Sequence, residues 1–331
     1  MARLEWLEKF LELYAFGDVN DFKEALTLKE QHMPHTLYRY RALTTQKNID
    51  NILDEVCKGT IYLAKPNEMN DPFDSCSIFK EENINSDDKF KARHMVAMKP
   101  HLSEEEFKKV LQSKDWLNEL NKLVAEKEAQ DDEMKRIELQ KVLKEITIGG
   151  FEDVNRAFND IFNDMARIAC FTESNTNLPM WTHYAGGHTG ICIEYNIDCL
   201  SNKLKRSRLI PVNYVGELPD ILKIFWEKEG CNPTILEYIL LHKLEDWSYE
   251  KEWRLILTVA DWYYSDKDVP KDFWDKGKVE KFMLPSKIYL GYKICKAYEK
   301  LFCKVCKPLG IEVYKMMRTE SGLLPVVCKD E

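Results

Sequence analysis

Two glutamates and an arginine in the last third of the chain have the types and spacing for acid–base chemistry. Glu250, Glu252 and Arg254 are each two positions apart at the start of an apolar run over 250–259. In a β-strand, residues two apart share a face, and three charged groups on such a strand are costly to bury unpaired. We interpret Glu250 and Glu252 as catalytic carboxylates that Arg254 orients. The alternative is a solvent-exposed face with mutually paired charges.

An arginine-rich run near the N-terminus could bind phosphate. In an extended Tyr38-Arg39-Tyr40-Arg41, the tyrosines share one face and the arginines the other. The planar guanidinium group suits bidentate recognition of phosphate. The alternative is an edge strand whose arginine stems lie along apolar surface.

A third polar and aromatic patch follows Cys170-Phe171-Thr172-Glu173. A short helix, with a proline at its start and a glycine past its end, would present Trp181, His183 and Tyr184. His183 and His188 are five apart across a Gly-Gly break, which is not the spacing of a helical zinc pair. The aromatic residues would otherwise belong to the core.

A fourth patch combines Tyr62 with the turn-rich segment that follows it. Prolines and asparagines over 65–74 predict an ordered loop or tight turn. Within it, Asp71 and Asp74 could bind a metal, although capping and turn formation are the commoner uses of such residues.

The elements that must position these patches alternate irregularly. Residues 1–36 are mainly helical, and a charged, glycine-free segment over 80–146, closed by Gly149-Gly150, predicts a helical insertion or lid within 80–150. The remainder, 151–331, predicts a helix over 151–166, further helices over 233–244 and 296–309, and short strands at 167–172, 190–195, 209–215, 250–259, 279–284, 287–290 and 311–316. We therefore expect a single α+β domain with a mixed or antiparallel sheet.

The sequence argues against a nucleotide-binding glycine loop, a membrane span and a cysteine zinc site. The chain has 331 residues, a net charge of −8 and ten cysteines, and no nucleotide-binding glycine motif occurs. No apolar run approaches the roughly 20 residues of a membrane span, so we expect a cytoplasmic protein without membrane contact. Cys303 and Cys306 form the only close cysteine pair and predict a helix face rather than a zinc site.

Several motifs together resemble the signature of a widespread bacterial family catalogued as a domain of unknown function. In order they are Tyr-Arg-Tyr-Arg, Met-Asn-Asp-Pro-Phe-Asp, Leu-Pro-Met-Trp-Thr-His-Tyr-Ala and Tyr-Glu-Lys-Glu-Trp-Arg, within 37–291. A more distant resemblance is to the ADP-ribosyltransferase fold, a split mixed sheet that binds NAD in its cleft.

This second resemblance implies a role for each patch. In that fold the first strand supplies an Arg or His, a later strand a Tyr or Ser, and a third strand the catalytic Glu. The resemblance therefore implies that Arg39 or Arg41 holds the dinucleotide, that Tyr62 matches the second of these residues, and that Glu250-x-Glu252 matches the third. It also implies NAD as substrate, no metal, and a protein or nucleic-acid acceptor, in bacterial antiphage defence or as a toxin. Glu252 is the first choice for the catalytic carboxylate and Glu250 the second; the candidate NAD-binding residues are Arg39, Arg41, Tyr62, Trp181, His183, Tyr184 and Arg254.

Two other functions remain open from the sequence. A metal-dependent nuclease or hydrolase would use Asp71, Asp74, His183, His188 and Glu194. A non-catalytic recognition module would use the same aromatic and polar patches as a ligand cleft.

Overall fold

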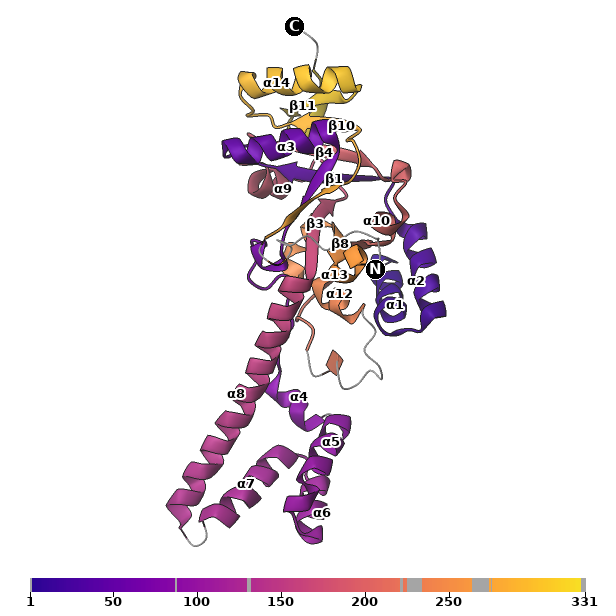
Figure 1. Ribbon diagram of the computed structural model, residues 1–331. Coiled ribbons are helices and arrows are strands. Elements are labelled where there is room, and N and C mark those ends of the chain that lie inside the picture. Colours follow the sequence, from indigo (N-terminus) through magenta and orange to yellow (C-terminus); the bar gives the residue numbers. More distant parts are fainter. Residues whose placement is uncertain are drawn as a thin grey trace. The chain divides into compact units, whose positions relative to one another are not determined.

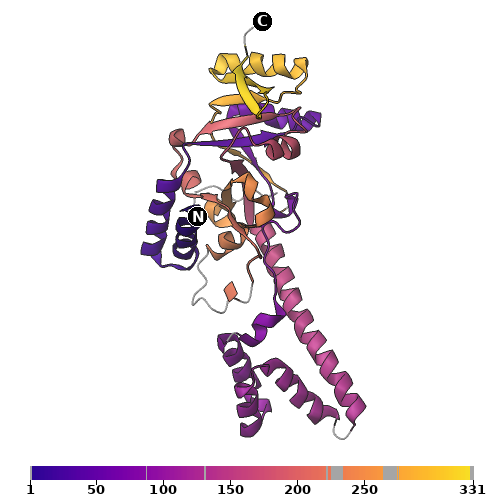
Figure 2. The same ribbon diagram turned by 180° about the vertical axis from the view of Figure 1, so that it is seen from behind.

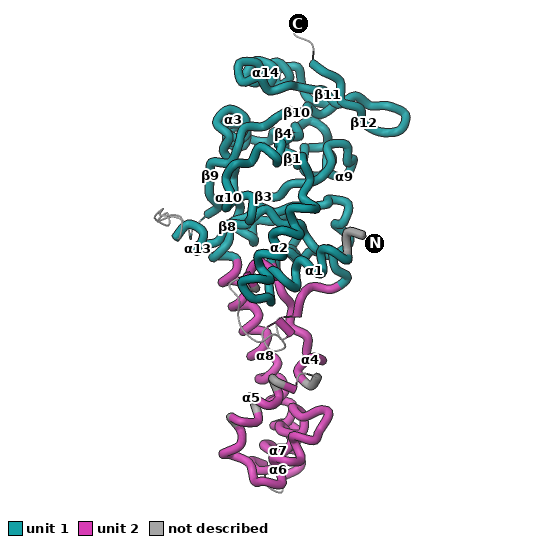
Figure 3. The backbone as a smooth tube through the Cα atoms, turned by 90° about the vertical axis from the view of Figure 1, so that its right-hand side faces the viewer, with its two compact units in different colours: residues 1–75, 163–216, 240–331 teal, residues 76–162, 217–239 magenta. Residues whose placement is uncertain are grey.

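The computed structural model describes residues 2–86, 88–129, 132–220, 223–224, 234–263, 274 and 276–328. The chain divides into two compact units, coloured separately in Figure 3. Unit 1 comprises residues 1–75, 163–216 and 240–331, and unit 2 comprises residues 76–162 and 217–239. All candidate site residues belong to unit 1.

Among the described residues, unit 1 is built on an eight-stranded sheet in the order β12-β11-β10-β4-β1-β3-β8-β5. Its strands are β1 (Thr36–Arg41), β3 (Ala166–Thr172), β4 (Ile191–Asn196), β5 (Leu209–Pro211), β8 (Glu252–Thr258), β10 (Lys287–Leu290), β11 (Glu312–Arg318) and β12 (Leu323–Val327). β10 and β11 are parallel, and the other neighbouring pairs are antiparallel. The predicted α+β fold with a mixed sheet is confirmed.

The sheet is split between β1 and β3. These strands share one residue pair, Tyr38 opposite Thr172, among the described residues. Farther along β3, Ile168 instead exchanges backbone hydrogen bonds with Ala64, just after β2 (Thr60–Leu63). β2 pairs with β9 (Lys278–Lys281) in a separate two-stranded sheet. The divergence of β1 from β3 therefore opens a gap in the sheet.

The split leaves β12, β11, β10, β4 and β1 on one side, and helices cover both faces of this larger half of the sheet (Figures 1 and 2). On one face, α3 (Gln46–Lys58) and α14 (Lys296–Cys306) contribute Ile52 and Phe302 to a core that contains Ile193 of β4. On the other face, α9 (Leu178–Tyr184) packs Trp181 into a second cluster. Alternation of side chains along each strand separates the two clusters.

The remaining elements of unit 1 are shorter or lie at its periphery. The N-terminal helices α1 (Ala2–Phe16) and α2 (Val19–His32) pack on each other, and Asp18 caps the second. The others are η1 (Pro66–Glu68), η3 (Ile197–Cys199), α10 (Lys203–Ser207), β6 (Asn213–Val215), β7 (His242–Leu244), η4 (Glu245–Glu250), α13 (Val259–Tyr263) and η5 (Lys307–Leu309).

The described residues of unit 2 are mainly helical, as their periodicity predicts. Among the described residues its helices are α4 (Glu81–Ser86), α5 (Asp88–Met98), η2 (Lys99–His101), α6 (Glu104–Gln112), α7 (Trp116–Ala129), α8 (Glu133–Met165), whose residues from 163 on belong to unit 1, and α12 (Ile235–Leu240), whose last residue belongs to unit 1. Trp116 is fully buried and donates a hydrogen bond from its indole nitrogen to the Ile84 carbonyl. No helix in the described parts of the chain is long and apolar enough to span a lipid bilayer.

Outside the candidate site, three predicted elements are wrong in detail. α8 continues through Gly149 and Gly150 rather than ending there, since a glycine inside a helix costs only about 1 kcal/mol and both flanks are strongly helical. The helix predicted over 233–244 ends at Leu240 and is followed by β7; its first residue lies outside the described residues. Residues 209–215 form two strands rather than one, β5 and β6, which belong to different sheets.

Candidate active site in the split of the sheet

A cavity of about 300 Å³ lies where the sheet splits. It is lined by residues of β1, β2, β3, β8 and α9, with others from the segments after β2 and before β8. The lining residues are Tyr38, Arg39, Tyr40, Arg41, Tyr62, Ala64, Glu68, Met69, Asn70, Asp74, Ile168, Cys170, Phe171, Thr172, Met180, Tyr184, Lys243, Glu250 and Glu252. All of them belong to unit 1.

Most of the residues singled out by the sequence line this cavity. They are Arg39, Arg41, Tyr62, Tyr184, Glu250 and Glu252. Trp181 does not line it: the ring is fully buried, packs edge-on against Tyr40 and donates a hydrogen bond to the Asn175 carbonyl. His183 is exposed on α9 and also does not line the cavity, and Arg254 lies buried behind Glu252.

The acidic end of the cavity is a buried network of three carboxylates and two cations. Lys243 Nζ lies 2.7 Å from Glu250, 3.1 Å from Asp74 and 3.3 Å from Glu252. The Arg254 guanidinium donates to both oxygens of Glu252, at 2.8 and 3.0 Å, and to Asp74 at 2.9 Å. Every member of this network is buried, so the charges compensate one another in a medium where isolated charges are costly.

The two glutamates reach this network from different backbone conformations. The sequence predicts both on one strand, but Glu250 is the last residue of η4, and β8 begins at Glu252. Between them Lys251 has a φ of 47°, and this left-handed residue turns the chain into β8. Thr172 donates a hydrogen bond to the Glu250 carbonyl, and the Glu252 N–H donates to the Tyr214 hydroxyl.

Their environments separate the ionisation of the two carboxyl groups. Burial raises the pKa of Glu250, the Glu252 charge adds to this, and Lys243 opposes both without cancelling them. Burial alone would also raise the pKa of Glu252, but Arg254 and Lys243 outweigh it and lower that pKa to about 2. Paired carboxyl groups whose pKa values are pushed apart are typical of sites that need one ionised group and one proton-transferring group.

Tyr184 connects α9 to the acidic network. Its hydroxyl donates to Glu250 Oε1 at 2.5 Å, and Asn70 Nδ2 donates to the same hydroxyl at 3.2 Å. Burial, followed by the charge of Glu250, raises the pKa of Tyr184, so the phenol stays a hydrogen-bond donor. Asn177 places the helix by capping its N-terminus and by donating to the Tyr249 carbonyl at 2.7 Å.

The two arginines of β1 differ in their partners. Arg39 crosses the gap in the sheet: its Nε donates to the Cys170 carbonyl at 3.2 Å, and its Nη1 donates to Glu55 at 2.8 Å. Arg41 Nε lies 3.6 Å from the same Glu55 carboxylate, is buried, and has no hydrogen-bond partner in the described part of the chain. Two arginines thus share one carboxylate, which leaves an excess positive charge at this end of the cavity.

Sequence reasoning missed Lys243 and gave Asp74 a different role. The pattern over 233–244 predicts a helix, in which nothing distinguishes Lys243 from a surface lysine, whereas the structure places it on β7. Asp74 stands in the Asn-Asp-Pro-Phe-Asp turn, which was examined for metal ligands, whereas here it accepts hydrogen bonds from Arg254 and Ser75. The closely spaced polar and proline residues of this turn are the sequence signal that could have pointed to Asp74, and Ser75, which follows it, adopts a positive φ of 58°.

The residues of the metal-dependent alternative are dispersed. Asp74 belongs to the ionic network, and Glu194 accepts hydrogen bonds from Tyr289 and Ser286. His188 stacks on Trp181, and His183 is exposed. Among the described residues, no three His, Cys, Asp or Glu side chains gather in a way that could hold a metal ion.

One segment of the chain, which contains most of the acidic end of the cavity, matches a known family model. Residues 180–255 match a family model described as a protein of unknown function (DUF2971). The DUF2971 match runs from α9 to β8 and includes Tyr184, Lys243, Glu250, Glu252 and Arg254. Neither the curated proteins nor the solved structures contain a match to the chain.

Proposed function

We propose that the cavity binds NAD and that the protein transfers its ADP-ribose group to an acceptor. One observation carries this proposal: the cavity joins an arginine end with excess positive charge to an acidic end with an ionised and a titrating carboxyl group. NAD has the matching polarity, an anionic pyrophosphate on one side of a ribose that becomes cationic when the nicotinamide leaves. The distant likeness to ADP-ribosyltransferases adds to this argument.

In this proposal Glu252 supports the departure of nicotinamide. The glycosidic bond between the ribose and the nicotinamide breaks, its electron pair leaves with the neutral nicotinamide, and positive charge develops on the ribose, as in glycoside hydrolysis. A fixed carboxylate beside that ribose stabilises the charge. Glu252 suits this role because Arg254 and Lys243 keep it ionised and hold its orientation.

Glu250 then serves the acceptor. An acceptor hydroxyl or water loses its proton to a general base as its oxygen bonds to the ribose carbon. The raised pKa of Glu250 makes it a better base than an ordinary glutamate, and Tyr184 and Lys243 orient its two oxygens. Tyr184 and Lys243 each hold one of the two carboxylate oxygens of Glu250 in this role.

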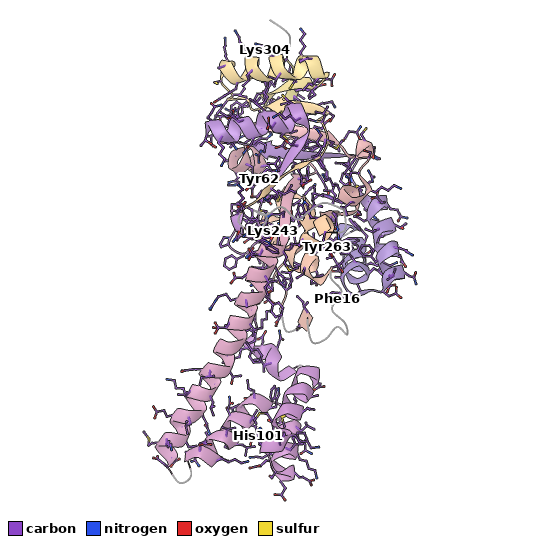
Figure 4. The ribbon with its side chains drawn as sticks, viewed as in Figure 1. Phe16, Tyr62, His101, Lys243, Tyr263 and Lys304 are labelled. Carbon is purple, nitrogen blue, oxygen red and sulfur yellow. The ribbon has the colours of Figure 1, made fainter. Side chains whose placement is uncertain are left out.

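The other end of the cavity would hold the phosphates and the aromatic leaving group. Arg41 offers the buried Nε–H that lacks a partner among the described residues, and an arginine pairs well with phosphate oxygens. Tyr62, labelled in Figure 4, lines the cavity and offers a ring for stacking. A volume of about 300 Å³ is at the lower limit for small-molecule sites, so it suits the nicotinamide-ribosyl half with the adenosine outside.

The two β1 arginines are predicted to respond differently to substitution. Arg41→Gln is expected to weaken NAD binding about tenfold, because one ion pair with phosphate is lost. Arg39→Gln is expected to lower the free energy of unfolding by about 1.5–3 kcal/mol, because Glu55 loses a charged hydrogen bond and the gap loses its bridge. NAD titration measures the loss of affinity and urea denaturation the loss of stability in both variants. If the two variants lose the same affinity and the same stability, the separate roles of Arg41 and Arg39 are contradicted.

The acceptor and the setting belong to the proposal as well. A protein or nucleic acid as acceptor, and a role in bacterial antiphage defence or as a toxin, follow from the family resemblance alone. Water would serve as a fallback acceptor, so that nicotinamide release can be measured without the natural target.

The test is the pH dependence of nicotinamide release by the purified protein. NAD is expected to raise the thermal midpoint by mass action and to yield nicotinamide. Because Glu250 must be ionised to accept a proton and its pKa is raised above its ordinary 4.5, release should increase as pH rises through a value above 4.5. Glu250→Gln is expected to remove this rise and slow release about 10²–10⁴-fold.

The matched control is Glu245→Gln, an exposed glutamate on the same η4 segment. It should keep both the rate and the pH profile. A protein whose thermal midpoint does not respond to NAD and that releases no nicotinamide at any pH would contradict the proposed function.

A further inference from the structure

A second hollow of unit 1 lies away from the candidate active site, between α14 and the outer hairpin of β11 and β12. Its volume is about 600 Å³. We call it the α14 groove and define it by the rim lysines Lys296, Lys300 and Lys304 and the floor residues Met317, Val326 and Val327. None of these residues lines the first cavity.

The rim concentrates positive charge on an otherwise acidic chain. Lys296, Lys300 and Lys304 are exposed, four residues apart on one side of α14, and make no ion pair among the described residues. Lys304 is labelled on α14 in Figure 4. Four residues rise about 6 Å along a helix, so these ammonium groups form a regular row. The chain as a whole has a net charge of −8.

The floor is aliphatic and exposed. α14 covers the inner part of the sheet but leaves Met317 at 48%, Val326 at 47% and Val327 at 56% exposure. An apolar patch rimmed by charge is typical of a surface that contacts another molecule. No aromatic residue lines the groove, whereas proteins that bind single-stranded nucleic acids typically stack the bases on aromatic side chains.

β12 is an edge strand, but it is poorly suited to adding another strand. Pro325 stands at its centre, paired with Met316, and has no N–H to offer to a neighbouring chain. A partner would therefore bind through side chains, and a row of lysines beside an apolar floor matches a helix in a groove.

From these observations we infer that the α14 groove binds an acidic amphipathic helix of a partner protein. The acidic residues of that helix, spaced by four, face Lys296, Lys300 and Lys304, and its aliphatic side chains lie on Met317, Val326 and Val327. This inference does not depend on the proposed NAD chemistry.

The experiment measures binding of a fluorescent helical peptide of about 20 residues to the full-length protein. The peptide has Glu at every fourth position on one flank and Leu on the adjoining face. Binding should weaken as salt rises. The double variant K300E/K304E is expected to bind about tenfold more weakly, since two ion pairs become repulsive. Val326→Ser tests the floor and should also weaken binding.

The matched control is K23E/K47E, which makes the same charge change at two exposed lysines of unit 1 outside the groove. It should bind like the unmodified protein. Equal binding by K300E/K304E, equal loss in the control, or no binding by any protein would overturn the inference. Binding of duplex DNA, lost in K300E/K304E while the peptide does not bind, would also overturn it and assign the rim to nucleic acid.

Discussion

Replacing Glu252 by glutamine is expected to slow nicotinamide release about 10²–10³-fold. The amide keeps the shape of the side chain but removes the negative charge that would face the developing ribose cation, and fixed charges of this kind contribute rate factors of about this size. NAD should still bind, because Arg41 and the aromatic lining are unchanged. A fall in kcat with little change in KM is therefore the expected pattern.

The measurement pairs this variant with Glu280→Gln. Glu280 is a part-buried carboxylate of unit 1 that accepts a hydrogen bond from the Trp262 indole and forms an ion pair with Lys205. It does not line the cavity. That control should release nicotinamide at the unmodified rate. Full activity in Glu252→Gln would show that the carboxylate is not catalytic, whatever the fate of NAD binding.

Replacing Arg254 by methionine is expected to cost about 3–5 kcal/mol of the free energy of unfolding. The guanidinium is fully buried and donates to Glu252, Asp74, Ser75 and the Leu240 carbonyl. Methionine fills part of the space but leaves the three buried carboxylates of the network with Lys243 as the remaining cation. Urea denaturation measures the loss as a lower midpoint at a similar slope.

A double variant separates lost packing from uncompensated charge. Asp74→Asn removes one of the carboxylates that Arg254 compensates, so the double variant should lose less than the sum of the two single losses. A coupling of about 0.5–3 kcal/mol is the range for residues in one network. Strict additivity would show that the cost of Arg254→Met comes from packing alone.

Local patterns were sufficient for the class of fold and for much of the candidate site. An alternating run predicted β1, short strand-forming segments predicted β3, β4 and β10, and the motif residues Arg39, Arg41, Tyr62, Tyr184, Glu250 and Glu252 line one cavity. Period and residue type are local properties, so a sequence exposes them directly. The same reasoning failed at Gly149-Gly150, where the helical preference of both flanks outweighed two weak residues.

The tertiary structure decided which of these residues meet and in what state. Lys243 lies on a short strand that the sequence did not predict, yet it contacts Asp74, Glu250 and Glu252. Its importance comes from contacts that a motif does not encode.

Ionisation and exposure are likewise collective properties. Glu250 and Glu252 are the same residue type two positions apart, and the sequence by itself determined only that two carboxyl groups would lie close together. Burial and the charge of Glu252 raise the pKa of Glu250, whereas Arg254 and Lys243 outweigh the effect of burial on Glu252 and lower its pKa, because an electrostatic environment depends on distances and burial in three dimensions. For the same reason Trp181 and Tyr184, both on α9, have different surroundings, one inside the core and one at the cavity.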